Sequence, residues 1–133
     1  AVADIYAQLG EKVTLPEMLT VNDAMILDFC GIEESDRKNA LVAICADSLK
    51  TDEIWVIEAT DEAAAKRIVD LAKARLKKKG EESITYSPEQ YAVVEKAQLL
   101  QNGSHVILLV SPDAQALATA LETVTGTTFE KMN

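Results

Sequence analysis

The chain contains a single histidine, His105, which directly follows Ser104. A serine nucleophile needs a general base within hydrogen-bond reach. Adjacent residues of a strand point to opposite faces, so Ser104 and His105 are poorly placed to serve as such a pair. We interpret His105 as a residue at the edge of a hairpin. No other grouping singles out a catalytic residue, and we expect the protein not to be an enzyme.

Adjacent acidic residues occur at four places, Glu33-Glu34, Asp52-Glu53, Asp61-Glu62 and Glu81-Glu82. A calcium loop needs oxygen ligands at alternating positions and a glycine at its sharp turn, and none of these pairs has that spacing. Acidic residues are also common at helix starts, where they meet the positive end of the helix dipole. The chain has no glycine-rich phosphate loop either. We therefore expect no metal ion and no other cofactor.

The two cysteines, Cys30 and Cys45, are too few for a disulfide scaffold and lack the spacing of a zinc site. Because they fall in different predicted elements, we expect two buried thiols, with a single bridge as the alternative. Trp55 is the only tryptophan and lies in the middle of a predicted strand. Packing in the core is the preferred interpretation for its side chain, and stacking on a ligand is the alternative.

Length and charge narrow the class of protein. A chain of 133 residues can bury one proper core, so we assign residues 1–133 to a single domain. The net charge of −9 argues against nucleic acid, because a phosphate backbone needs a basic surface. It also argues against adsorption to an anionic lipid surface. No stretch approaches the roughly 18 apolar residues that cross a bilayer.

The chain repeats itself, because residues 44–72 align with residues 96–124. The alignment places Ile54-Trp55-Val56-Ile57 on Val106-Ile107-Leu108-Leu109 and Asp61 on Asp113. Each copy contains a short strand, a polar turn, an apolar strand and an alanine-rich helix. The pattern predicts two β-β-α units.

The first β-β-α unit covers residues 40–80. Its strands are predicted at 41–46 and 54–59, because both runs are apolar and short. Thr60 is a suitable N-cap for the following helix, which we expect to end at Gly80.

The second β-β-α unit covers residues 87–125 and includes a short extra helix. Ser87 and Gln90 fit a capping box with a proline between them at the first helical position. Asn102-Gly103 predicts a two-residue hairpin turn of type I′. We expect the tail after Gly126 to be loose.

Residues 1–39 are predicted to form a helical lead-in. Asn22 is a suitable N-cap and Gly31 a suitable C-cap for a helix within this segment. The complete prediction is an α+β fold. Two β-β-α repeats form a four-stranded antiparallel sheet with both long helices on one face, and the helical segment precedes them.

Both faces of the strands at 53–59 and 105–111 are apolar, although a sheet covered on one side normally alternates apolar and polar residues. We assign the helices to the face of Trp55, Ile57, Ile107 and Leu109. The opposite side is the candidate interaction face and carries Ile54, Val56, Val106, Leu108 and Val110. A monomer rarely exposes a contiguous apolar face of this kind. We therefore expect that either residues 1–39 cover this face or a second copy or protein partner does.

Several of these patterns resemble a bacterial family of small, lipoprotein-like envelope proteins, catalogued as domain of unknown function four-three-five-eight. The similarity extends over about residues 20–125. The matching positions are Leu27, Phe29, Gly31 and Ile32, then Asp52-Glu53-Ile54 to Asp61, then Tyr86, Pro88-Glu89-Gln90 and Ala97, and finally Gly103 to Asp113.

The resemblance implies an extracytoplasmic domain associated with the cell envelope. Members of the family carry an N-terminal signal, often with a lipid-attachment cysteine, so we expect membrane association only through an N-terminal anchor that this chain lacks. The family contributes no catalytic residues. The sequence itself does not decide between this location and the cytoplasm.

The leading functional hypothesis is a non-catalytic binding or assembly module that contacts a protein partner or a second copy. The alternative is a small-molecule sensor or carrier that binds its ligand at the sheet or at a subunit interface. An enzyme of unknown class comes third.

Overall fold

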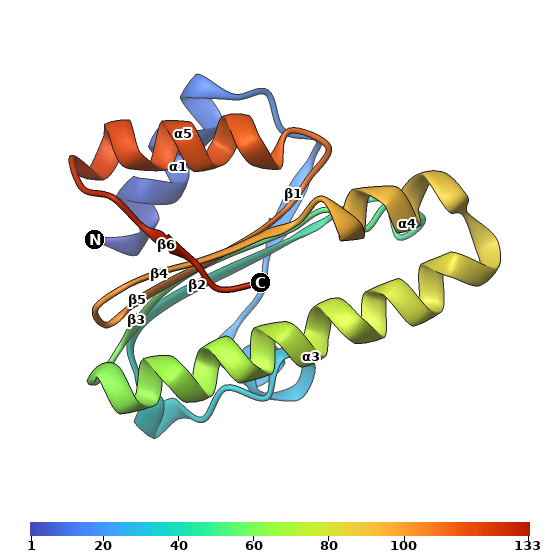
Figure 1. Ribbon diagram of the computed structural model, residues 1–133. Helices are drawn as coiled ribbons and strands as arrows, with labels where there is room; N and C mark the ends of the chain where they lie inside the picture. Colours follow the sequence, from blue (N-terminus) through green and yellow to red (C-terminus); the bar gives the residue numbers. More distant parts are fainter.

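A six-stranded antiparallel sheet with helices on both faces organises the computed structural model, which describes residues 1–133 (Figure 1). The strand order is β1-β2-β3-β5-β4-β6. The strands are β1 (Met18–Thr20), β2 (Arg37–Cys45), β3 (Glu53–Ala59), β4 (Gln98–Asn102), β5 (His105–Val110) and β6 (Glu130–Lys131). The helices are α1 (Val2–Lys12), α2 (Asp23–Met25), α3 (Glu62–Tyr86), α4 (Pro88–Glu95) and α5 (Ala114–Thr125), with a π-helical turn η1 (Ile26–Cys30) and a 3-10 turn η2 (Glu34–Asp36).

The α+β class and the two hairpins, β2-β3 and β4-β5, agree with the sequence prediction. The predicted number of four strands is wrong, because β1 pairs with β2 and β6 pairs with β4 at the two edges. Both additional strands are short and have no apolar alternation that would reveal them. They form where the neighbouring strand offers unpaired backbone groups.

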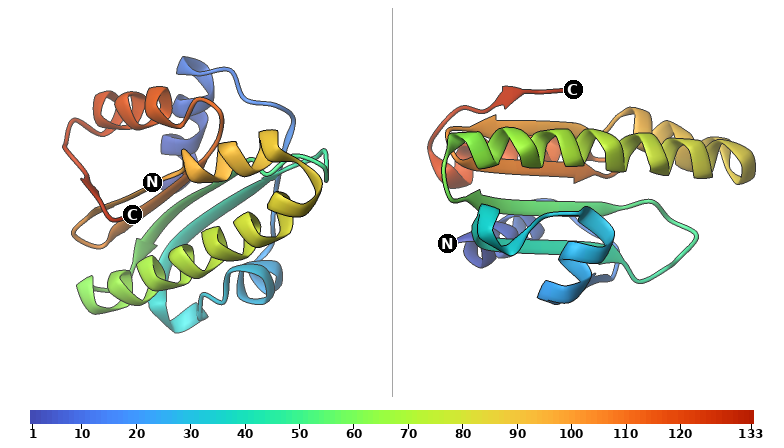
Figure 2. Two further views of the ribbon diagram at one scale, coloured as in Figure 1. Left: turned by 45° about the vertical axis from the view of Figure 1, so that its right-hand side comes forward. Right: turned by 90° about the horizontal axis from the view of Figure 1, so that it is seen from below.

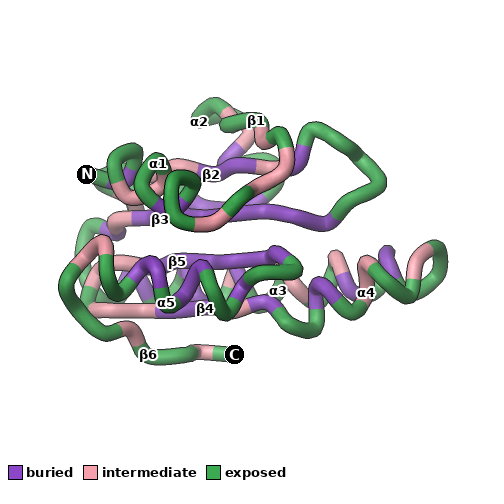
Figure 3. The backbone as a smooth tube through the Cα atoms, turned by 90° about the horizontal axis from the view of Figure 1, so that it is seen from above, coloured by how far each residue is buried: buried purple, intermediate pink, exposed green.

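The two long helices lie on opposite faces of the sheet, which corrects the prediction that they share one face (Figure 1). Helix α3 covers one face together with η1 and α4, and it extends past the end of the sheet (Figure 2). Helices α1 and α5 cover the other face. The sheet is therefore the middle layer, and β3 and β5 are buried on both sides (Figure 3).

The register of β3 against β5 explains why the sequence placed both long helices on one face. Trp55 lies opposite Leu108, and Ile54 lies opposite Leu109. Directly opposed residues share a face, so Trp55 belongs with Leu108 rather than with Leu109. The internal repeat aligns odd-numbered residues of β3 with odd-numbered residues of β5. The hydrogen-bonded register instead places odd-numbered residues of β3 opposite even-numbered residues of β5.

The lead-in of residues 1–39 covers both faces of the sheet, one part on each. Helix α1 packs beside α5 through Leu9, which is fully buried. Ile26, Cys30 and Ile32 pack on the side of α3. Of the two alternatives, the structure therefore shows cover by residues 1–39 of the chain itself. Strand β1 interrupts the predicted helical segment.

Most of the predicted helix-capping residues do cap helices in the structure. The side chain of Asn22 accepts a hydrogen bond from the Met25 amide at 2.9 Å, and Gly31 ends η1 with φ of 74°. The N-cap of α3 is Asp61 rather than Thr60, because its carboxylate accepts a bond from the Ala64 amide at 2.8 Å.

Helix α3 also continues through Gly80 to Tyr86, which corrects its predicted end. Gly80 is buried against α4, with room for a methyl group 3.6 Å from the ring of Tyr91. Packing against α4 therefore continues the helix past a residue that is unfavourable inside helices.

The predicted hairpin turn exists, but its two loop residues are Gly103 and Ser104, because Asn102 already pairs with His105. Of these two loop residues, only Gly103 has a positive φ, of 56°, which fits a type II′ turn rather than type I′. The predicted loose tail is also wrong. The side chain of Asn133 accepts a bond from the Leu99 amide at 2.9 Å, next to the pairing of β6 with β4.

Candidate functional site

The five residues of the candidate interaction face are all core residues with at most 1% exposure, and they do not share a face. Ile54 and Val56 pack under α1 and α5. Val106, Leu108 and Val110 pack under α3. The single interaction face proposed from the sequence is therefore wrong. Trp55 is fully buried, in agreement with the preferred interpretation of core packing.

A buried ion cluster, which we call the Glu53 cluster, lies between β3 and α3. The Glu53 side chain has 1% exposure and accepts hydrogen bonds on both oxygens. Arg75 donates to Oε1 from Nη2 at 2.8 Å and to Oε2 from Nε at 3.1 Å. The Lys79 ammonium lies 3.2 Å from Oε1, and the Trp55 indole N–H donates to Oε2 at 2.7 Å.

The Glu53 cluster keeps its carboxylate ionised. Burial by itself raises the pKa of Glu53, but the bonds from Arg75, the charge of Lys79 and the bond from Trp55 outweigh it and hold the pKa below its usual value. The cluster also fixes the indole of Trp55, which would otherwise be a buried donor without a partner.

A second set of contacts ties the β2–β3 loop to the helices. Lys79 donates to the carbonyl oxygen of Thr51 at 3.0 Å. The Gln90 side chain accepts from both the amide and the hydroxyl of Thr51 at 2.9 Å. Gln90 thus serves a tertiary contact and not the capping box predicted for it, whereas Ser87 does cap α4 through the Gln90 amide at 3.2 Å.

The sequence interpretation missed the Glu53 cluster because Glu53 follows Asp52 at the edge of a turn, where acidic residues are common. Its main partner, Arg75, lies 22 residues away inside a run of solvated cations. One feature of the sequence did indicate its burial. Glu53 lies two residues before Trp55 and four before Ile57 in the same strand, so its side chain points to the same buried face.

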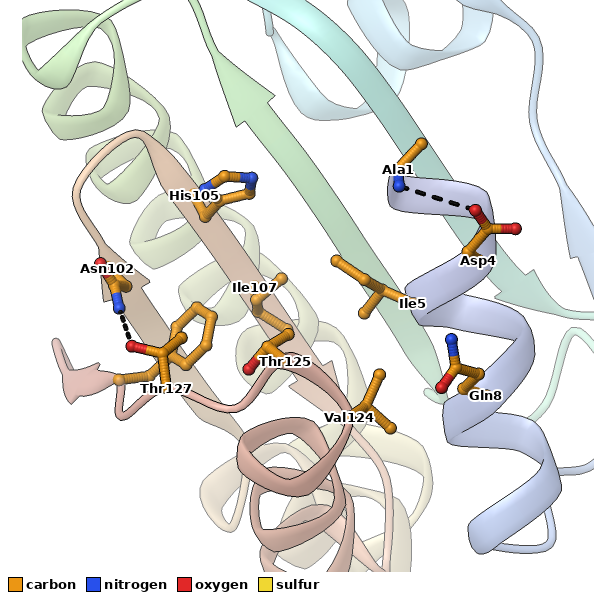
Figure 4. A pocket seen from close by; sticks show the side chains of 11 residues that line it. Ala1, Asp4, Ile5, Gln8, Asn102, His105, Ile107, Val124, Thr125 and Thr127 are labelled. Atoms are coloured by element: carbon orange, nitrogen blue, oxygen red, sulfur yellow. Dashed lines mark hydrogen bonds and ion pairs between the residues drawn. The ribbon is translucent and has the colours of Figure 1, made fainter.

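The largest cavity, which we call the α1–α5 pocket, opens between these two helices and the β4–β5 hairpin and has a volume of about 570 Å³ (Figure 4). It is lined by Ala1, Asp4, Ile5, Gln8, Asn102, His105, Ile107, Val124, Thr125, Thr127 and Phe129. In the close view, Ile5 and Gln8 project from α1 toward Ile107 and Val124 (Figure 4). Apolar walls and polar rim groups therefore converge on one space.

His105 lies in this pocket, at the start of β5. It stands opposite Glu58 on the neighbouring strand. The Glu58 carboxylate accepts a hydrogen bond from the side-chain Nδ2 of Asn39 at 2.9 Å, and this bond, together with the nearby His105, lowers the pKa of Glu58. Asn102 is likewise engaged, because it donates to the Thr127 hydroxyl at 2.8 Å.

Cys30 and Cys45 are free and buried. Burial, assisted by the charge of Glu53, raises the pKa of Cys30 to about 12. A thiol of this kind is protonated at neutral pH and is a weak nucleophile. The structure contains no group of three or more histidine, cysteine or acidic side chains arranged to hold a metal ion. None of its helices combines the length and the apolar character needed to span a bilayer.

Comparison with known proteins gives one finding. A family model described as "Domain of unknown function (DUF4358)" matches residues 11–111. Neither the curated proteins nor the solved structures contain a match to the chain. Because the family model covers most of the sequence, the protein belongs to the DUF4358 family of domains of unknown function.

Proposed function

We propose that the protein is a non-catalytic ligand-binding domain whose site is the α1–α5 pocket. The observation that carries this proposal is the cavity of about 570 Å³, which lies within the usual size range of small-molecule sites. Its walls are apolar at Ile5, Ile107 and Val124, while Gln8 and His105 supply polar groups. A few polar groups around an apolar space are typical of sites that orient a small molecule.

This proposal favours the sensor or carrier alternative over assembly with a protein partner. The partner hypothesis depended on an uncovered apolar face of the sheet. Because α3 covers one face and α1 and α5 cover the other, that reason no longer applies.

We further propose an extracytoplasmic location with the domain tethered to the cell envelope. The support is membership of the DUF4358 family, whose resemblance led to this expectation. Fractionation of cells that produce the natural full-length protein tests it, and recovery of the protein in the cytosolic fraction would contradict it.

The ligand proposal is tested by thermal unfolding of the domain in a small-molecule library. A ligand that binds only the folded state at 100 times its Kd adds about 2.7 kcal/mol, which corresponds to a rise in Tm of roughly 10 °C for a domain of this size. Each hit is then mapped by chemical shifts of the His105 and Ile107 amides, which line the pocket.

A pocket-filling variant provides the control. Gln8→Trp places a large side chain at the pocket, whereas Ala7→Trp places the same side chain at an exposed α1 position that does not line it. We expect hits to lose binding in Gln8→Trp and to retain it in Ala7→Trp. Equal loss in both variants, or no hits that shift the pocket amides, would overturn the proposal.

A further inference from the structure

The Glu53 cluster contains one more cation than carboxylates. Arg75 and Lys79 both bind Glu53, and their side chains have only 19% and 12% exposure. The other bond of Lys79 goes to the neutral carbonyl oxygen of Thr51. A largely buried positive charge is costly unless an anion accompanies it. The hydrogen-bonded cluster thus carries a net charge of +1, and the next carboxylates are Glu82 near Arg75 and Asp52 near Lys79.

This charge lies at a groove of about 420 Å³ between α3, the β2–β3 loop and η1, which we call the α3 groove. Lys50 and Lys78 also line it, and neither forms an ion pair in the structure. Asp52 and Glu82 are the remaining carboxylates of the lining. Cations therefore outnumber carboxylates in the groove, in contrast to the chain as a whole with its net charge of −9.

The walls of the α3 groove are apolar and partly aromatic. Leu19, Phe29 and Tyr86 line it with exposures of 52%, 49% and 52%. Phe29 belongs to the π-helical turn η1, a type of structure that is frequent at functional sites. Three large apolar side chains that remain half exposed around an excess cation fit a ligand with an anionic head and an apolar body.

We propose that the α3 groove is a second binding site, which takes a small organic carboxylate with an aromatic or branched apolar group. The carboxylate is held by Arg75, Lys78 and Lys79, and the apolar group lies between Phe29 and Tyr86. The lining falls within residues 11–111, the part of the chain that matches the family. The site is separate from the α1–α5 pocket, so it extends beyond the proposed function.

The single tryptophan provides a probe of this site, because its indole N–H binds the same carboxylate as Arg75. In a proton–nitrogen NMR titration, Trp55 gives one indole signal. We expect millimolar benzoate to shift this signal in a saturable way. Benzamide has the same shape without the charge, and we expect it to bind at least tenfold more weakly. Absence of a saturable benzoate shift, or equal binding of benzamide, would overturn the proposal.

A matched pair of variants tests the cation. Lys78 lines the groove and Lys73 does not, although both are exposed residues of α3. We expect Lys78→Gln to weaken benzoate binding about three- to tenfold and Lys73→Gln to leave it unchanged. Equal effects would show a non-specific response to net charge and would contradict the proposal.

The Gln8→Trp variant separates this site from the α1–α5 pocket. We expect it to bind benzoate with unchanged affinity through the α3 groove. If Gln8→Trp abolishes benzoate binding and the shifts concentrate at Ile107, the ligand occupies the other pocket and the second site is refuted, whereas the proposed function stands.

Discussion

Replacing Glu53 with glutamine tests whether the Glu53 cluster is held together by an ionised carboxylate. The substitution keeps the shape of the side chain and removes its charge. Glu53 has 1% exposure and is surrounded only by donors, from Arg75, Lys79 and Trp55. The glutamine amide group would turn its own N–H donors toward one of these groups, so at least one contact is lost.

The expected loss of stability follows from burial. Removing one member of a buried ion pair costs about 3–5 kcal/mol, because the remaining charge lacks a partner. Here Arg75 and Lys79 keep 19% and 12% exposure, so water can partly solvate them. We therefore expect a value near the lower end, about 3 kcal/mol, and a fall in Tm of roughly 10–15 °C.

Urea unfolding, followed by Trp55 fluorescence and far-ultraviolet circular dichroism, measures this loss. Because the folded-state pKa of Glu53 is lowered from its ordinary value of 4.5, its contribution is fully present above that value. It is lost as the pH falls through the lower, folded-state pKa. The wild type and Glu53→Gln should therefore differ most near pH 7 and converge at low pH.

Glu81→Gln is the matched control, because Glu81 is an exposed carboxylate of α3 without an ion pair. We expect it to change stability by less than about 0.5 kcal/mol. A loss below about 1 kcal/mol for Glu53→Gln at pH 7 would refute the argument. So would a gap between wild type and variant that stays constant down to pH 3.

Three further predictions concern the backbone and the lead-in. Gly80→Ala should stabilise the protein by about 0.5–1 kcal/mol in urea unfolding, because a methyl group fits 3.6 Å from Tyr91 within a helix, and a loss of stability would contradict this. Gly31→Ala should destabilise it by about 1–2 kcal/mol in the same assay, since φ is 74° and the new Cβ would lie 3.2 Å from Leu71, and a neutral result would oppose the argument. Deletion of residues 1–39 should cause aggregation or loss of a cooperative melt, because both apolar faces lose cover, and a well-folded monomer in sedimentation analysis would disprove it.

Signals that act within a few residues could be read from the sequence. Asn22 and Ser87 cap helices as predicted, because each needs only an amide three residues further on. Gly31 ends its turn for an equally local reason, since a positive φ favours glycine. The hairpins followed from short apolar runs on either side of polar turns.

Features that depend on pairing between distant segments could not be predicted in this way. The faces of β3 and β5 were assigned wrongly because one residue of register decides which side chains share a face. Edge strand β6 has two exposed residues, Glu130 and Lys131, and gives no apolar signal at all. The Glu53 cluster and the α1–α5 pocket likewise join residues that are far apart along the chain.

The two candidate sites lie near opposite ends of β3 and on opposite faces of the sheet. Glu53 stands at one end of β3, and His105 lies opposite Glu58 near the other end. Glu58 lies five residue steps along the strand from Glu53, which corresponds to about 17 Å. The sites also face opposite layers, since Glu53 binds α3 while the other pocket lies beneath α1 and α5. The strand between them is packed on both faces, so the core of the sheet separates the two sites.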